Sequence, residues 1–237
     1  MQRDLPSSLS SALPFGGPLP WAAGAQLARV SSIDDPERLN RVQVRLLAFD
    51  DTTGQDAAMW ARVVAPFAGD DRGTFFVPDV DDEVLVVFAQ GDPRHPLVLG
   101  GLWNGGAAAP ADIESGGLNR YKRIKSKNGI VVTLDDQSGQ ETLTLETPGG
   151  CSLTLKDGPG TVTLEDSNGN SIELATSGIT VKAAAQVTVQ ASQVTVSAGM
   201  VKVDAVMADF TGIVKCAVLQ TNAVISASYT PGAGNVW

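Results

Sequence analysis

The chain has 237 residues, of which 43% are hydrophobic and 18% are charged, and its formal net charge is −9. This composition is that of an ordered protein with one or two domains. The acidic balance argues against nucleic-acid binding, because a phosphate backbone requires a basic surface. No apolar run is long enough to span a membrane. The N-terminus also lacks the cationic start and apolar core of a signal peptide, so we expect cytoplasmic synthesis without one.

Residues 1–20 are rich in Ser, Gly, Leu and Pro, and four of them are prolines. Such a composition predicts an extended N-terminal arm or docking tail rather than a domain. Two interpretations stay open, namely an arm that packs on a neighbouring subunit and a disordered leader.

Residues 21–106 have the pattern of a compact β-domain. Alternating apolar residues predict strands at 27–33, 40–49, 58–66, 83–88 and 96–102. Five strands in about eighty residues, with no convincing helix, favour a small closed Greek-key barrel, most simply an OB-fold. We expect Phe88 and Trp103 in its core, because both lie in or beside a strand. A platform for single-stranded nucleic acid would instead need exposed aromatic residues interleaved with Arg or Lys.

Residues 107–125 are expected to form a linker, and residues 126–228 carry a repeated strand pattern. Between 141 and 206, pairs of aliphatic residues recur with Thr, Glu or Lys between them. This alternation is typical of strands with one buried face. The leading aliphatics are first nine or ten residues apart and later seven or eight. We therefore expect a structure that narrows toward the C-terminus.

Each repeat can bury only two or three residues, which is too few for a private core. A single-chain β-helix usually needs rungs of about twenty residues. The sequence therefore predicts an all-β protein in which an N-terminal OB barrel is followed by an intertwined, trimeric β-helix, or β-prism. We expect the trimer core to consist of the paired aliphatics of successive repeats: Leu143, Leu145, Leu153, Leu155, Val162, Leu164, Ile172, Leu174, Ile179, Val181, Val187, Val189, Val194, Val196, Val201 and Val203.

The sequence offers little for catalysis or metal binding. His95, the only histidine, lies in a turn between two prolines, and the acidic pairs that include Asp35 and Asp71 also fall in predicted turns. Two cysteines are too few for a disulfide framework or a zinc site, and we expect Cys151 to be a small buried hydrophobic residue. We therefore expect no enzyme, no cofactor and no metal. The alternatives are a β-solenoid carbohydrate-active enzyme, which needs a carboxylate cluster on one face, and a β-helix scaffold protein.

Two segments of the chain carry a resemblance to a known family. They are GTFFVPDVDDEVLVVFAQGDPRHPLVLGGLWN at 73–104 and RYKRIKSKNGIVVTLDD at 120–136. The first resembles the OB domain of the VgrG and phage baseplate protein V family, and the second resembles the family's passage from the OB domain into the β-prism. Asp81 is a departure, because the family commonly has Gly there. About twenty residues precede the OB domain, so the layout is similar to the short form in which the hub is a separate protein.

The resemblance implies a homotrimeric central spike at the baseplate of a contractile injection particle. Such a spike is mounted on the hub and inner tube and is driven through a target envelope when the sheath contracts. Its implied partners are hub and baseplate proteins, a PAAR-type tip protein and effector cargo, and the particle is either cytoplasmic or released. The turn-rich tail at 229–237 is expected to seat or cap the tip. The residues expected to form this platform are Tyr229, Pro231, Asn235 and Trp237.

Overall fold

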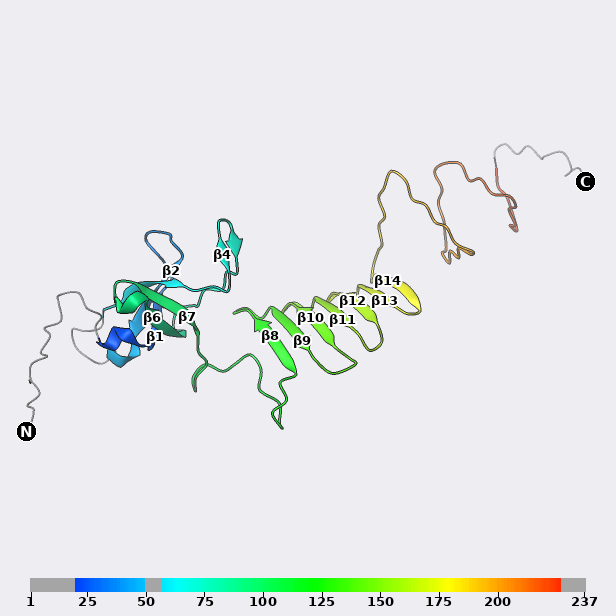
Figure 1. Ribbon diagram of the computed structural model, residues 1–237. Coiled ribbons are helices and arrows are strands. Elements are labelled where there is room, and N and C mark those ends of the chain that lie inside the picture. Colours follow the sequence, from blue (N-terminus) through cyan, green and yellow to red (C-terminus); the bar gives the residue numbers. More distant parts are fainter. Residues whose placement is uncertain (1–19, 50–56, 227–237) are drawn as a thin grey trace, which may run out of the picture. The chain divides into compact units, whose positions relative to one another are not determined.

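The computed structural model describes residues 20–49 and 57–226 (Figure 1). The chain divides into two units, Met1–Gln186 and Val187–Trp237. The first unit contains a barrel and a separate sheet, whereas no residue after Lys182 in the described part of the chain lies in a strand. Among the described residues, no helix is long and apolar enough to cross a membrane.

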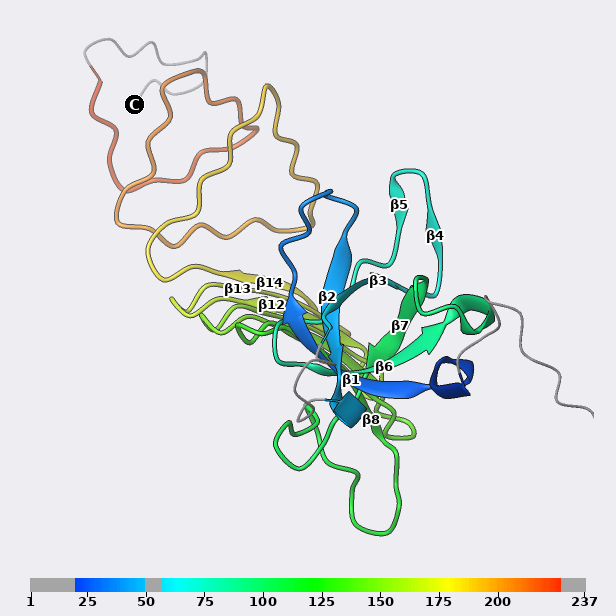
Figure 2. The same ribbon diagram turned by 90° about the vertical axis from the view of Figure 1, so that its left-hand side faces the viewer.

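The N-terminal part of the first unit is a closed five-stranded barrel with the strand order β1-β2-β3-β7-β6 (Figure 2). Its strands are antiparallel neighbours except for β3 and β7, which run parallel. The five strands predicted from the sequence are confirmed. Their bounds are β1 Gln26–Ser32, β2 Arg41–Leu46, β3 Met59–Val63, β6 Glu83–Phe88 and β7 Pro96–Gly101.

Shorter elements connect these strands. The 3-10 helix η1 precedes the first strand, and a small hairpin of two strands, β4 and β5, lies between β3 and β6. The bounds of these elements are η1 Pro20–Ala23, η2 Leu47–Phe49, β4 Ala68–Gly69, β5 Arg72–Gly73 and η3 Ala89–Gly91.

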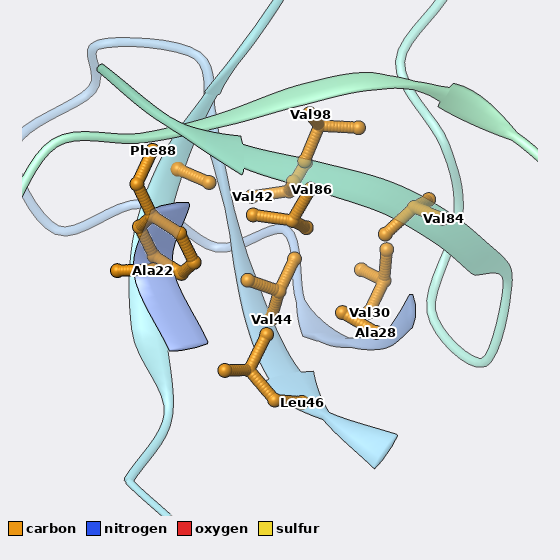
Figure 3. Close-up of a cluster of buried hydrophobic side chains, with 11 residues drawn as sticks. Ala22, Ala28, Val30, Val42, Val44, Leu46, Val84, Val86, Phe88 and Val98 are labelled. Atoms are coloured by element: carbon orange, nitrogen blue, oxygen red, sulfur yellow. The ribbon is translucent and has the colours of Figure 1, made fainter. Parts of the chain in front are cut away.

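The barrel interior is filled by small aliphatic side chains from alternate strand positions (Figure 3). Valine dominates, since a five-stranded barrel leaves little internal volume and β-branched residues suit strands. Phe88 is buried, as the sequence predicted, but Trp103 is 71% exposed, so its predicted burial is wrong. Trp103 lies beyond the end of β7, where alternation no longer directs side chains inward. The buried residues are Ala22, Ala28, Val30, Val42, Val44, Leu46, Ala61, Val84, Val86, Phe88 and Val98.

The second part of the first unit is a seven-stranded sheet in which every strand pairs with its neighbour in sequence. All pairs are antiparallel, so the sheet is a meander of hairpins within one chain. Turns of two to six residues join β9 to β14, and Gly150 and Gly169 take positive φ angles of 84° and 85° in two of them. The strands are β8 Tyr121–Lys125, β9 Val131–Asp135, β10 Thr142–Glu146, β11 Ser152–Lys156, β12 Thr161–Glu165, β13 Ser171–Ala175 and β14 Gly178–Lys182.

Repeat length and turn composition both change near the point where this meander stops. A spacing of nine or ten residues accommodates a five-residue strand and a hairpin turn of four or five residues. The spacing is seven between Ile172 and Ile179, where β13 and β14 still form a hairpin through a two-residue turn, whereas beyond Lys182 the turns consist mainly of Ala and Ser. Val187 and Val189 are accordingly exposed and lie outside any strand in the described chain. An intertwined β-helix is a property of several chains, and it stays a prediction here.

Candidate self-association surface

The β8–β14 sheet has one apolar face, on which aliphatic side chains form two columns. In the first column Leu145 is directly opposite Val132 and Leu153, and Leu164 is opposite Leu153 and Ile172. In the second column Leu155 is opposite Leu143 and Val162. Cross-strand neighbours of this kind contact each other along the sheet. The columns are Ile124, Val132, Leu145, Leu153, Leu164, Ile172 and Val181, and Leu134, Leu143, Leu155, Val162, Leu174 and Ile179.

This apolar face is not covered by the chain that carries it. Nine of its thirteen residues are exposed, up to 72% at Ile179, and the other four, Val132, Leu143, Leu153 and Val162, are half-buried. Monomeric proteins rarely expose contiguous apolar patches larger than a few hundred Å². The face therefore requires a partner.

The opposite face of the sheet is polar. Its central column consists mainly of threonines, which lie directly opposite one another from strand to strand. Arg123 begins the column on β8 and Glu173 interrupts it on β13. The sheet is therefore amphipathic, with one face suited to water and one to protein. The threonines are Thr133, Thr144, Thr154, Thr163 and Thr180.

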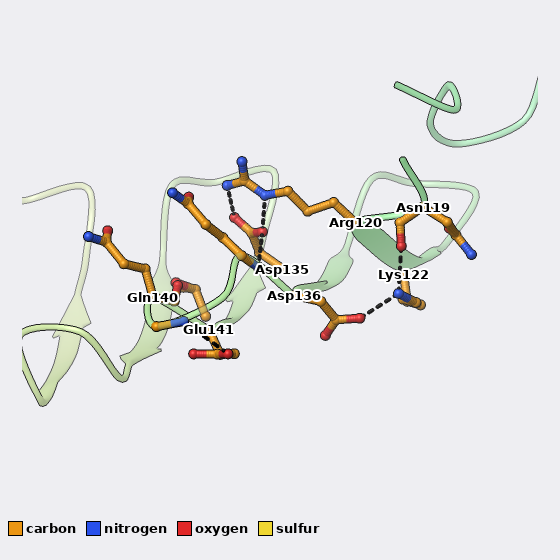
Figure 4. A network of polar contacts seen from close by, with 10 residues as sticks. Asn119, Arg120, Lys122, Asp135, Asp136, Gln140 and Glu141 are labelled. Carbon is orange, nitrogen blue, oxygen red and sulfur yellow. Dashed lines mark hydrogen bonds and ion pairs between the residues drawn. The ribbon is translucent and has the colours of Figure 1, made fainter. Parts of the chain in front are cut away.

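Ion pairs fix the first strands of the sheet (Figure 4). Arg120 forms two parallel contacts with the carboxylate of Asp135, and Lys122 pairs with Asp136 while its Nζ donates to the carbonyl of Asn119 at 2.7 Å. The Arg120 guanidinium also lies 4.9 Å from the ring centroid of Tyr121. The hydrogen bond from Arg120 lowers the pKa of Asp135 below its ordinary value. Bidentate Arg–carboxylate contacts of this kind are geometrically specific.

A second contact joins the sheet to the barrel part of the same unit. Lys127, in the turn between β8 and β9, pairs with Asp79 in the loop before β6. This hydrogen bond lowers the pKa of the Asp79 carboxyl and raises that of the Lys127 ammonium. Because Lys127 is largely exposed, the pair contributes orientation more than stability.

The turn between β12 and β13 is organised by one carboxylate. Asp166 accepts hydrogen bonds from the backbone N–H groups of Asn168 and Asn170 at 2.8 and 3.0 Å and from both side-chain amides. These donors, the Asn170 side chain first, lower the pKa of Asp166 to about 2. Asn170 in turn accepts a hydrogen bond from the backbone N–H of Ala184, just beyond β14.

The candidate catalytic and metal-binding residues do not assemble into a site. In the described chain, no group of three or more His, Cys, Asp or Glu side chains is placed to hold a metal ion. The His95 side chain is 66% exposed, as expected for a turn, and its Nε2 lies 4.0 Å from Asp92. Cys151 is exposed, so the predicted burial is wrong for the single chain. It lies one residue before β11, at the margin of the apolar face.

The predicted trimer-core residues fall into two groups. Those from Leu143 to Val181 lie on the one apolar face of the sheet, whereas those from Val187 to Val203 lie in the second unit, outside any strand. Their role in a trimer core stays a prediction. The platform residues Tyr229, Pro231, Asn235 and Trp237 and the predicted arm at 1–19 lie outside the described residues. The chain carries two matches to known protein families, at positions that coincide with its two folded parts.

Residues 26–103 match the type VI secretion system and phage-baseplate injector OB domain. Residues 142–202 match the phage baseplate V C-terminal trimerisation domain. The first match coincides with the barrel, and the second runs from β10 to beyond β14. The chain belongs to the VgrG and phage baseplate protein V family of spike proteins. In this family context, the uncovered apolar face lies largely within a trimerisation domain.

Curated VgrG relatives match over part of their length. The type VI secretion system spike protein VgrG4b of Pseudomonas aeruginosa is 30% identical over 139 residues, which are 55% of this chain and 17% of the relative. VgrG1b of the same organism is 27% identical over 138 residues, 53% of this chain and 18% of the relative. VgrG3 of Vibrio cholerae is 27% identical over 97 residues, 40% of this chain and 10% of the relative. The matched region thus spans less than a fifth of each of these VgrG proteins.

Proposed function

We propose that this chain forms the homotrimeric central spike of a contractile injection particle. One observation carries the proposal, namely a sheet with two columns of uncovered aliphatic side chains that coincides with a trimerisation domain and follows an injector OB domain. Three copies that turn these faces toward a common axis bury the columns together. Burying one such side chain contributes about 1.5–3 kcal/mol.

The same arrangement suits a piercing role. With the apolar faces at the axis, the threonine columns face water, and each side of the prism is a sheet whose backbone groups are paired. Such a body has no flexible joint along the β8–β14 sheet, and separating it requires removing three aliphatic faces from each other at once. High kinetic stability follows, which is what a protein pushed through an envelope requires.

The second unit is proposed to continue the prism by pairing between chains. Its repeats of seven or eight residues leave only two or three residues between five-residue strands, and each repeat is long enough for one side of a three-sided prism. A chain that steps to the next side at each repeat places its strands beside strands of the other two copies. The repeats from Val187 to Val203 then gain the strand partners that one chain does not offer.

The ends of the spike define its proposed partners. The OB barrel is proposed to fix the trimer to hub and baseplate proteins beneath the inner tube, so that sheath contraction drives the spike into a target envelope. The tail at 229–237 is proposed to seat a PAAR-type tip protein, and effector proteins are proposed to travel as cargo. The proposal assigns no chemistry to the chain itself, so any enzymatic activity of the particle belongs to that cargo.

The test uses the strain that makes the protein. Particles are sedimented from cells that carry a tagged copy and from cells that lack the gene, and both are imaged by electron microscopy. The proposal predicts that the tagged protein sediments with sheathed particles and is found at the baseplate end. It also predicts that the deletion strain makes no complete baseplates until the wild-type gene is restored. Intact baseplates in the deletion strain would overturn it.

A further inference from the structure

The outer surface of the barrel differs sharply from one side to the other. On β2 and β3 the outward positions are mostly polar or cationic, with Arg41 opposite Arg62 and Gln43 opposite Trp60. On β6 and β7 the outward positions are largely aliphatic, and β1 adds Leu27. We call these residues the apolar stripe, and they are Leu27, Leu85, Val87, Leu97 and Leu99.

The apolar stripe is continuous across three neighbouring strands. Leu27 is directly opposite Leu85, and Val87 is directly opposite Leu97. Leu27 and Leu99 are each 46% exposed, and the other three members are half-buried. Arg29 and Glu83, which lie opposite each other, end the stripe at one side. The barrel is closed, so a partner cannot add a strand here and must pack on the face.

We propose that residues 1–19 of the same chain cover the apolar stripe. The position from which this segment leaves the barrel supports this choice. Helix η1 follows it directly and contacts β6, the central strand of the stripe, as well as η3. Ala22 of η1 is buried in the same cluster as Phe88. Helix η1, where residues 1–19 join the barrel, therefore lies at the Phe88 end of β6, near the opposed pair Val87 and Leu97.

The composition of the segment fits the stripe. Besides Met1, it carries five large apolar residues, and it has only two charged side chains, Arg3 and Asp4. Its three prolines each remove a backbone donor, so it is better suited to face packing than to strand pairing. An extended chain of this length reaches about 60 Å, far more than the stripe requires, and tethering raises its local concentration. The apolar residues are Leu5, Leu9, Leu13, Phe15 and Leu19.

The inference does not depend on the proposed spike function, since the stripe and the segment belong to one chain. A neighbouring copy or a baseplate protein is the competing occupant. A purified full-length chain excludes a baseplate protein, and substitutions within the segment distinguish it from a neighbouring copy.

The test measures how fast a cysteine in the stripe reacts with a maleimide. In the full chain with Cys151→Ser and Cys216→Ser, Leu99→Cys reports on the stripe, and Arg62→Cys reports on the polar side as the matched control. Each is combined with an intact segment or with Leu5→Ser, Leu9→Ser and Leu13→Ser together. Reaction of a covered thiol follows the population of the open state, so the triple substitution should speed labelling at position 99 by about tenfold or more. Labelling at position 62 should be unchanged.

Two results would overturn the proposal. Fast labelling at position 99 with an intact segment would show that the stripe is open to solvent. Slow labelling that the triple substitution leaves unchanged would mean that another copy of the chain covers it. A photoreactive residue at Phe15 adds an independent readout, because the proposal predicts cross-links to β6 or β7 of the same chain. Cross-links to a second copy would contradict it.

Discussion

At the scale of single residues, Asp35 is a buried carboxylate that organises the loop between two barrel strands. It is buried, and its carboxylate accepts hydrogen bonds from the backbone N–H groups of Glu37, Leu39 and Arg41 at 3.1, 2.9 and 3.3 Å. The Arg41 guanidinium adds two more, at 3.1 and 2.8 Å. The Asp35 carboxylate thus holds the loop between β1 and β2 in place and forms an ion pair with Arg41.

Replacing this carboxylate should destabilise the barrel. Asp35→Asn keeps the size of the side chain but removes its charge and one acceptor oxygen, so that Arg41 and a backbone donor lose their partner. The lost hydrogen bonds lower the free energy of unfolding, and in a domain of this size a small change in that free energy shifts Tm by several degrees. Thermal melting should therefore show a fall in Tm of about 5 °C or more. Asp34→Asn is the control, since Asp34 is exposed and in the described chain only its backbone N–H, not its carboxylate, forms a hydrogen bond, to the hydroxyl of Ser32. Equal melting of both variants would contradict this account.

Acid should weaken the same contact. The hydrogen bond from Arg41 is the largest cause that lowers the pKa of the Asp35 carboxyl in the folded chain. A depressed folded pKa contributes stability that is complete above the unfolded pKa, about 3.9, and is lost as the pH falls toward the folded value. The wild type and Asp35→Asn should unfold at different urea midpoint concentrations at pH 7, and the difference between these midpoints should become smaller below about pH 4. A difference that stays constant from pH 7 to pH 3 would contradict this.

At the scale of elements, the two faces of one strand should respond oppositely to the same substitution. Leu153→Glu places a carboxylate in an apolar column of β11, and threefold symmetry would bring three of them together without cations. This variant should be monomeric by light scattering, whereas Thr154→Glu, on the polar face of the same strand, should remain trimeric. Glu173 already occupies the threonine column, so a glutamate is tolerated there. A trimeric Leu153→Glu variant would contradict the assignment of the faces.

The second unit should pair between chains. Thr188 and Thr195 occupy equivalent places in successive seven-residue repeats. One chain carries a cysteine at position 188 and a second, differently tagged chain carries one at position 195, and both lack other cysteines. A short thiol cross-linker should join the two chains. Thr144 and Thr154, which are opposite each other on β10 and β11, should cross-link only when both cysteines are in one chain. Cross-links at 188 and 195 that form only within one chain would contradict the proposed winding.

Much of the fold could be predicted from alternation alone, because a strand with one buried face has a period of two. The five barrel strands and the paired aliphatics of β10 to β14 follow from it. Alternation did not reveal that the longer repeats form hairpins within one chain, although their Gly-rich turns are the signal for it. It also misplaced Trp103, which lies beyond the end of a strand. Asp35 lies in a turn as predicted, but its burial and its contact with Arg41 six residues later are not encoded by alternation.

At the scale of the whole molecule, the central feature is the apolar face of the β8–β14 sheet. A single chain leaves most of this face exposed, and the exposed fraction is largest at Ile179 on β14. The family match places a trimerisation domain over most of this face. Beyond this sheet, from Ala183 to the end, charge does not oppose assembly either, since the only charged side chains there are Lys202, Lys215, Asp204 and Asp209 and their charges cancel.

The mass of the purified full-length protein in solution tests the proposed trimer most directly. Multi-angle light scattering should give three times the mass of one chain, and an unboiled gel in mild SDS should keep that trimer intact until the sample is heated. A mass of one chain, or migration as a monomer without boiling, would contradict the trimeric spike.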